Sequence, residues 1–183
     1  MVRVGLAWTG TVPNDVKPLE GFQPVVSWRS RLAHVRHIGV GEQVGYSGKW
    51  KAKRPSLIGI VPVGYAGGYP MGVGAGDGDG CAHVRLFDNQ FNNAIGDAQV
   101  VGSVCMDQIA IDVTDYPTTG VGSGVELIST DATSKATLDQ IALAAGVVPH
   151  AIISKISSKV HRAYRSPAVQ IDTAPSNQLK QCL

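Results

Sequence analysis

The chain has 183 residues, of which 44% are hydrophobic and 16% are charged, so it can bury the core of one domain. Its net charge of +2 is too small to indicate a protein that binds nucleic acid or an anionic membrane. Three cysteines without paired spacing argue against a disulfide framework or a zinc site, and we expect no metal site. Without a targeting segment or an apolar run of ~18 residues, the sequence predicts a soluble, cytoplasmic protein.

Most of the chain predicts short strands separated by turns, and its 22 glycines and 10 prolines fit that pattern. Residues 1–10 form an apolar run that ends in a turn, so we predict a strand there. Residues 25–37 predict one long strand, and residues 57–63 predict a strand buried on both faces because nearly all of them are apolar. The other predicted strands are residues 43–50, 83–87, 98–104, 108–113 and 125–129.

Glycine occupies every second position from Gly72 to Gly80. Such a segment has few side chains to bury, so we predict that residues 69–80 form a mobile loop that does not contribute to the core. The stretch superficially resembles a calcium-binding loop. It lacks the spacing of an EF-hand and the distal glutamate, and we therefore expect no calcium site.

One segment carries clear helical signals. Thr137 and Gln140 form a capping box, and apolar residues follow at helical spacing until Gly146, which predicts the end of that helix. A second short helix is predicted to begin at Pro149. The polar residues 167–183 are predicted to fray. Together these signals predict a mainly β fold, a twisted β-barrel-like domain with one or two short helices.

Four clusters combine polar or reactive side chains with small residues, and glycine lets another molecule approach the backbone closely. They are centred on Tyr46, Tyr65, the Cys105-Met106-Asp107 segment and the Arg3-Val4-Gly5-Leu6 segment. Arginine followed by glycine can present a cation and free N–H groups to a phosphate. Considered alone, each tyrosine is better explained by a half-buried side chain whose hydroxyl reaches the surface, and Cys105 by a small buried apolar side chain.

The order and spacing of these clusters along residues 2–165 resemble the C-terminal domain of alanine racemases, fold-type III enzymes that use pyridoxal 5′-phosphate (PLP). The resemblance implies the twisted β-barrel-like domain of that family. Two departures lie within the motifs, because Gly67 stands where the family has aspartate and Ser103 where it has arginine. The family motifs Arg-Pro-Gly, Leu/Arg-Ser-Arg, Val-Gly-Tyr-Gly-x-Thr-Trp, Ile-Gly-Tyr-Ala-Asp-Gly-Tyr-Pro and Val-Gly-Arg-Val-x-Met-Asp are similar, in this order, to residues 3–6, 28–31, 44–50, 63–70 and 101–107.

The resemblance implies roles for three residues near the substrate. Tyr46 matches the tyrosine base that works on one face of the substrate Cα. The second base of the family is the lysine that carries the cofactor. Tyr65 matches a tyrosine of the substrate entryway, and Met106 matches the position whose backbone N–H binds the substrate carboxylate.

The resemblance also implies contacts with PLP. Arg3 matches the arginine that hydrogen-bonds the pyridine nitrogen, and Gly5 and Leu6 match positions whose backbone amides hold the phosphate. The family places a tyrosine near the end of this domain against the phosphate. Here Ser158 stands at that position and Tyr164 lies further on, so either residue is a candidate for the phosphate contact.

In the family, a (β/α)₈ barrel of roughly 250 residues precedes this domain and carries the lysine. We therefore interpret residues 1–10 as a remnant of the last barrel strand, 11–166 as the C-terminal β domain and 167–183 as a frayed tail. We expect the isolated chain to be inactive. The resemblance implies a cytoplasmic homodimer that interconverts L- and D-alanine for peptidoglycan. The alternatives are a racemase of broader specificity that acts on serine or lysine, and a non-catalytic dimerisation or binding domain.

Overall fold

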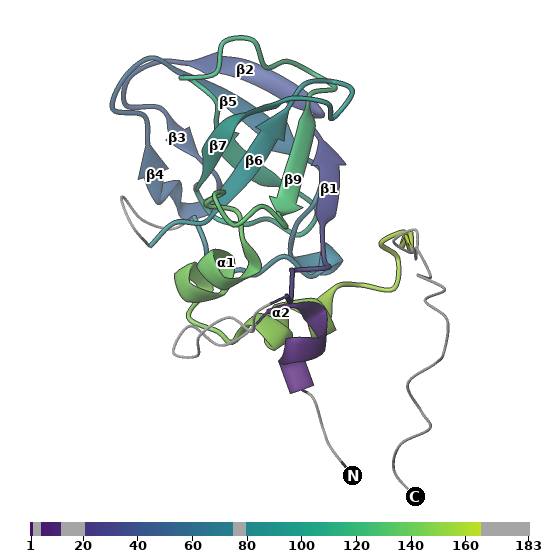
Figure 1. Ribbon diagram of the computed structural model, residues 1–183. Helices are drawn as coiled ribbons and strands as arrows, with labels where there is room; N and C mark the ends of the chain where they lie inside the picture. Colours follow the sequence, from purple (N-terminus) through teal and green to yellow (C-terminus); the bar gives the residue numbers. More distant parts are fainter. Residues whose placement is uncertain (2–4, 12–20, 75–79, 166–183) are drawn as a thin grey trace, which may run out of the picture.

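The computed structural model describes residues 1, 5–11, 21–74 and 80–165, and the predicted mainly β fold is confirmed. Seven antiparallel strands form one sheet in the order β1-β9-β6-β7-β8-β5-β2, and a two-stranded hairpin of β3 and β4 lies beside it (Figure 1). The strands are β1 Trp28–Arg31, β2 His34–Ile38, β3 Gln43–Val44, β4 Trp50–Lys51, β5 Ser56–Val61, β6 His83–Phe87, β7 Ala94–Val101, β8 Ile109–Asp112 and β9 Gly124–Ile128.

The sheet curls because β1 and β2, which are consecutive in the chain, lie at its two opposite edges. The Leu32 N–H donates to the Ser123 carbonyl (3.0 Å), next to β9, whereas the Ala33 N–H donates to the Ile60 carbonyl of β5 (2.8 Å). The chain thus changes its pairing partner between these two residues and links both edges. The single strand predicted for residues 25–37 is therefore wrong, because two strands with different partners occupy this range.

Aliphatic side chains fill the inner face of the curled sheet. Val125 and Leu127 of β9, Val84 and Leu86 of β6 and Ile111 of β8 are fully enclosed. These alternating positions are the ones that a curled, closed sheet must fill with apolar side chains. The core therefore lies inside the curl and fixes the shape of the sheet.

A second apolar cluster packs the β3–β4 hairpin against the outer face of the sheet. The hairpin contributes Val44 and Trp50, and the sheet contributes Ile58 and Val101, among others. Val61, also in β5, belongs to the inner cluster instead. Strand β5 therefore buries side chains on both faces, as its apolar sequence predicts.

Two helices cover one end of the sheet: α1 (Leu138–Ala145) and α2 (Pro149–Lys155) (Figure 1). The Thr137 half of the predicted capping box is confirmed, because the Thr137 hydroxyl oxygen accepts from the Gln140 N–H, at 3.4 Å. Gly146 ends α1 with φ 64°, a left-handed conformation that glycine adopts without strain. No helix within the described ranges is both long enough and apolar enough to span a bilayer.

Two segments predicted as strands contain short 3-10 helices. Gly5–Thr9 forms one of these (η1), and Gly5 has φ 60°, which is outside the β region. Residues 43–50 divide into β3, the 3-10 helix η2 (Tyr46–Gly48) and β4. Here the positive φ angles of Gly45 (78°) and Gly48 (56°) turn the chain back on itself.

The start of the glycine-rich segment belongs to the core, contrary to our prediction. Tyr69 is 2% exposed and packs edge-on against Trp28, with 6.2 Å between ring centroids. Val73 is 0% exposed. The small neighbouring residues let the backbone reach the core, so these two side chains enter it. Residues 75–79, like the predicted tail 167–183, lie outside the described residues.

Candidate functional site

The connection of residues 102–108 between β7 and β8 holds the turns that carry Tyr46 and Tyr65. Its own turn is closed by the Cys105 N–H, which donates to the Gln108 carbonyl (3.0 Å). The η2 turn with Tyr46 contacts the beginning of this connection, and the η3 turn (Tyr65–Gly67) contacts its middle. Three clusters that are separate in the sequence therefore meet on one short segment.

The Tyr46 turn approaches the connection through glycine backbone. A Cβ added to Gly45 would lie 2.8 Å from the Ser103 nitrogen, and one added to Gly102 would lie 2.5 Å from the Val44 carbonyl oxygen. Both glycines also have positive φ, 78° and 72°. Any side chain at either position would be both strained and in collision, so glycine is required for this close contact.

The Tyr65 turn is hydrogen-bonded to the same connection. The Tyr65 N–H donates to the Cys105 carbonyl (3.1 Å), and the Ala66 N–H donates to the Met106 carbonyl (2.9 Å). A Cβ on Gly64 would lie 2.2 Å from the Cys105 oxygen. Two main-chain hydrogen bonds and one glycine contact therefore fix the backbone from which the Tyr65 side chain projects.

The three residues predicted to act on the substrate are exposed at this site. The exposed fractions are 72% for Tyr46, 55% for Met106 and 39% for Tyr65. Large apolar side chains that stay uncovered while the backbone beneath them is firmly held are typical of a surface that meets another molecule. The structure thus brings together the turns and the connection that carry these residues, an arrangement that the sequence motifs alone did not predict.

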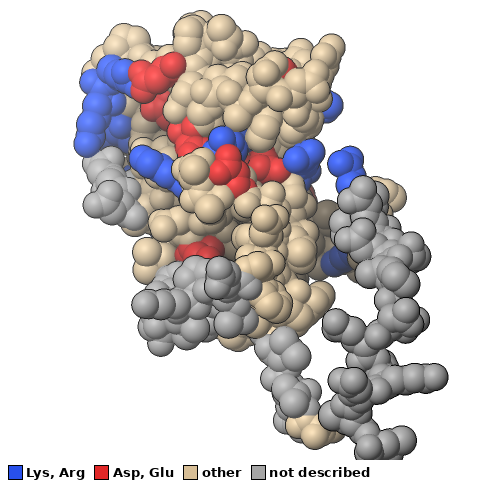
Figure 2. Space-filling model, in the orientation of Figure 1, with Lys and Arg blue, Asp and Glu red and all other residues tan. Residues whose placement is uncertain are grey.

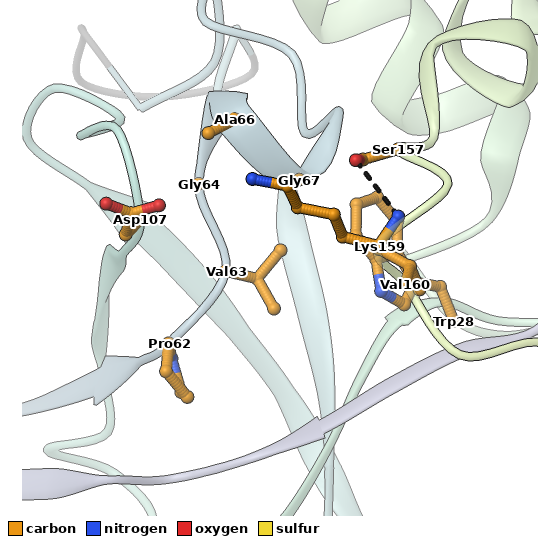
Figure 3. A pocket seen from close by; sticks show the side chains of 10 residues that line it. All are labelled: Trp28, Pro62, Val63, Gly64, Ala66, Gly67, Asp107, Ser157, Lys159 and Val160. Carbon is orange, nitrogen blue, oxygen red and sulfur yellow. Dashed lines mark hydrogen bonds between the residues drawn. The ribbon is translucent and has the colours of Figure 1, made fainter.

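A pocket of about 220 Å³ opens beside the Tyr65 turn. The segment after α2 forms one wall, where the Ser157 N–H donates to the Gly67 carbonyl (3.0 Å). Figure 3 shows the Lys159 side chain extending from this wall past Gly67 toward Gly64, with Asp107 on the far side. The pocket therefore carries one cation and one carboxylate at separate places on its lining.

Charged groups on the wall of the sheet are neutralised by their neighbours. Arg85 pairs with Asp131 at 2.9 Å, and Asp97 accepts from the Ser134 hydroxyl and from the Lys135 N–H, both at 2.8 Å. The pKa of Asp131 is lowered, first by its hydrogen bonds from Thr133. On the face drawn in Figure 2, acidic and basic side chains lie next to one another. These groups serve the structure of the wall and leave the tyrosine turns as the candidate site.

Comparison with known proteins identifies the family. The chain matches the model of the alanine racemase C-terminal domain over residues 25–164. The chain belongs to this family. The alanine racemase of Halothermothrix orenii is 33% identical over 169 residues, which are 91% of this chain and 41% of the relative.

Solved structures of alanine racemases share the fold of this domain. The biosynthetic enzyme of Pseudomonas aeruginosa is 34% identical, with a TM-score of 0.74 over 88% of this chain and 41% of that one. The enzyme of Bartonella henselae with covalently bound pyridoxal phosphate is 25% identical, with a TM-score of 0.70 over 88% of this chain and 40% of that one. The chain spans about two fifths of the length of these racemases.

The residues that the racemase resemblance assigns to PLP do not form an enclosed site in the described part of this domain. Arg3 lies outside the described residues. Gly5 and Ser158 are exposed, and Tyr164 is 90% exposed. Among the described residues, no hydrogen bond joins Gly5, Ser158 and Tyr164 to one another, and no group of His, Cys, Asp or Glu could hold a metal ion. The described residues alone therefore do not surround a cofactor.

Sequence reasoning missed one contact of the racemase domain. The Ser103 hydroxyl donates to the Tyr46 carbonyl at 3.1 Å, across 57 positions of sequence. The only available signal was the pair of glycines, Gly45 and Gly102, each placed next to one of these residues. Glycine can indicate a close backbone approach, but it does not say which other segment approaches.

Proposed function

We propose that this chain is the C-terminal domain of an alanine racemase and supplies Tyr46 as the acid–base residue of the active site. The observation that carries the proposal is the placement of the Tyr46 turn, the Tyr65 turn and Met106 on one connection. Membership of the family and the order of the motifs support it. Tyr65 then lines the entryway to the substrate, and the Met106 N–H binds the substrate carboxylate.

Racemisation requires that one proton leave Cα and another arrive from the opposite face. Two groups on opposite sides of the substrate meet this requirement, and each needs an atom that can both take and give a proton. The Tyr46 hydroxyl oxygen serves one face. Because the side chain is 72% exposed on a fixed turn, its hydroxyl can project beyond the domain toward a substrate bound on another surface.

The second surface in this proposal is a (β/α)₈ barrel that carries PLP on a lysine. The barrel belongs to the other subunit of a homodimer, so that Tyr46 acts across the interface. We place Arg3, Gly5, Leu6 and either Ser158 or Tyr164 near the cofactor of the chain's own barrel. The enzyme is cytoplasmic and provides D-alanine for peptidoglycan.

The proposal is tested by joining residues 11–183 of this chain to the barrel of the Pseudomonas aeruginosa enzyme, whose solved structure is similar. The chimera should convert L-alanine to D-alanine and exchange the Cα hydrogen with solvent. The 183-residue chain with added PLP should do neither. Parallel assays with serine and lysine test the broader specificity. A folded chimera that holds PLP but leaves all three amino acids unchanged would argue against a catalytic role.

The shared active site is tested by mixing two inactive subunits. One carries Tyr46→Phe, and the other lacks the cofactor lysine of the barrel. If Tyr46 acts across the interface, one of the two sites in each mixed dimer regains both bases, and activity returns. Subunit exchange is followed by mass spectrometry of differently labelled subunits. Complete subunit exchange without any return of activity would mean that each active site takes Tyr46 and the lysine from the same subunit.

A further inference from the structure

The Tyr46 turn is held at both ends, although its phenol is exposed. At one end, a Cβ on Gly48 would lie 2.2 Å from the Gln43 side-chain oxygen, so this side chain packs against the glycine. At the other end, Gly45 lies against the Ser103 nitrogen. Between them, Ser47 has φ 64°, a conformation that non-glycine residues rarely adopt. A turn of this kind keeps its shape only while its surroundings hold it.

The Ser103 side chain makes a direct contact with Tyr46 itself. Its hydroxyl donates to the Tyr46 carbonyl oxygen at 3.1 Å, and Ser103 is half-buried on the 102–108 connection. That connection also receives the Tyr65 turn through the Cys105 and Met106 carbonyls. The hydroxyl therefore fixes the orientation of the Tyr46 peptide group relative to the segment that places the other two substrate residues.

We propose that Ser103 is a positioning residue that sets the placement of the Tyr46 phenol. This inference rests on the catalytic role proposed for Tyr46. The phenol is joined to the backbone by two side-chain torsions, and its hydroxyl oxygen is the side-chain atom furthest from the backbone. A small tilt of the Tyr46 peptide group therefore displaces this oxygen more than any other atom of the side chain. Proton transfer needs heavy atoms within hydrogen-bond reach, and a small displacement of the phenol therefore slows the chemical step more than it weakens substrate binding.

Loss of the Ser103 hydroxyl should leave the fold intact. The Tyr46 carbonyl lies in an exposed turn, so water can replace the lost donor. The glycine contacts and the apolar packing of the hairpin remain in place. Ser103→Ala thus separates positioning from folding. Ser103→Thr keeps a hydroxyl and is the conservative variant, and Ser154→Ala removes a similar exposed serine-to-carbonyl bond (3.3 Å to Ala151) as the matched control.

The first measurement is hydrogen exchange of the 183-residue chain, which does not depend on catalysis. Ser103→Ala should speed amide exchange in residues 45–49 by about 3- to 10-fold, the range that one net hydrogen bond allows. Ser103→Thr should exchange like the parent chain, and Ser154→Ala should leave residues 45–49 unchanged. Equal exchange of residues 45–49 in Ser103→Ala and the parent chain would overturn the inference.

The second measurement is catalysis in the racemase formed by this chain and its barrel. Ser103→Ala should lower kcat by about 10-fold with little change in KM, and Ser103→Thr should restore it. The loss should be larger for solvent exchange of the Cα hydrogen on the Tyr46 face. In a Tyr46→Phe background, Ser103→Ala should have no further effect. If kcat falls in Tyr46→Phe but not in Ser103→Ala, the positioning role of Ser103 is overturned and the catalytic role of Tyr46 stands. An unaffected Tyr46→Phe would overturn the catalytic role and this inference with it.

Discussion

The wall of the curled sheet and the end that carries the two tyrosine turns are held together in different ways. In the wall, side chains such as Val84, Ile111 and Val125 are completely buried, and apolar packing provides the cohesion. At the tyrosine end, Tyr46 and Met106 stay exposed, while backbone atoms and glycines make the contacts. One region is therefore specified by its side chains and the other by its main chain.

This difference implies different tolerance to substitution. An apolar core accepts side chains of similar volume at modest cost, because neighbouring side chains can shift slightly. A contact between two backbones at a glycine has no such freedom, since an added Cβ meets an atom that cannot move alone. We therefore expect changes in the wall to affect stability above all. Changes at the tyrosine end should affect catalysis or, where a glycine contact is lost, the geometry and stability of one turn.

The largest expected effect is at the tyrosine end. In the racemase formed with the barrel, Tyr46→Phe should lower kcat by ~10²–10⁴-fold, which is the usual contribution of a general acid–base residue. Tyr65→Phe should act mainly by raising KM, because a positioning contact is lost equally in the ground and transition states. Steady-state kinetics and Cα-hydrogen exchange from each enantiomer measure both. The assignment is reversed if Tyr65→Phe abolishes exchange on one face and Tyr46→Phe does not.

The next effect should appear in the wall. Ile111 lies in β8 with no exposed surface, so Ile111→Ala should lower the free energy of unfolding by about 2–5 kcal/mol through lost burial and a cavity. Urea unfolding of the 183-residue chain measures this change. Val121→Ala, at a side chain that is 64% exposed, is the control and should stay near the parent stability. Similar losses in both variants would show that Ile111 does not contribute to the core as its burial implies.

The elements predicted correctly from the sequence depend on local signals. The strand predicted for residues 83–87 has the bounds of β6, and the cap at Thr137 and the stop at Gly146 are present. Alternation of apolar residues and capping hydrogen bonds act within a few positions, so they can be read directly from the chain.

The elements that were missed depend on distant partners. The change from β1 to β2 follows from hydrogen bonds to Ser123 and Ile60, which lie far from Leu32 and Ala33 in the sequence. Glycine content likewise suggested a loop for residues 69–80, but the burial of individual side chains depends on where the backbone runs. Local composition carries neither kind of information.

The motifs predicted which residues belong to the candidate site, but they did not predict how these residues are arranged in space. Resemblance to a family selected Tyr46, Tyr65 and Met106, and the structure adds that one connection carries all three. The contact of Ser103 with Tyr46 joins residues 57 positions apart, in a place where the family has arginine. Neither spacing nor resemblance could therefore have predicted it.

A smaller effect should follow from adding one methyl group at the tyrosine end. In Gly64→Ala, the new Cβ would lie 2.2 Å from the Cys105 carbonyl oxygen, so the turn or the connection must shift. Such overpacking should cost about 1–3 kcal/mol of stability. Gly120→Ala is the matched control, because no atom lies within 4 Å of its Cβ position. Differential scanning calorimetry compares the two, and equal melting temperatures would mean that the Gly64 contact is not tight.

The smallest effect concerns His83, a half-buried residue in the wall at the start of β6. Burial lowers its pKa from the ordinary value of 6.5, and the nearby Lys135 lowers it further, while Asp97 partly opposes the shift. Below pH 6.5 the unfolded chain therefore takes up a proton that the folded chain resists, so stability should fall as the pH drops from 6.5 to the lower folded pKa. Below that folded pKa, His83 should add no further pH dependence.

The His83→Gln variant tests this pH dependence and the independence of the two regions. It should reduce the loss of stability on acidification, measured as the midpoint of urea unfolding at a series of pH values. His34→Gln is the control, because His34 is exposed in β2. Since His83 acts in the wall, its replacement should leave the amide exchange of residues 45–49 unchanged. If the pH dependence of stability is the same in His83→Gln and the parent chain, the burial of His83 does not cause it. Faster amide exchange in the Tyr46 turn would show that the wall and the site are coupled.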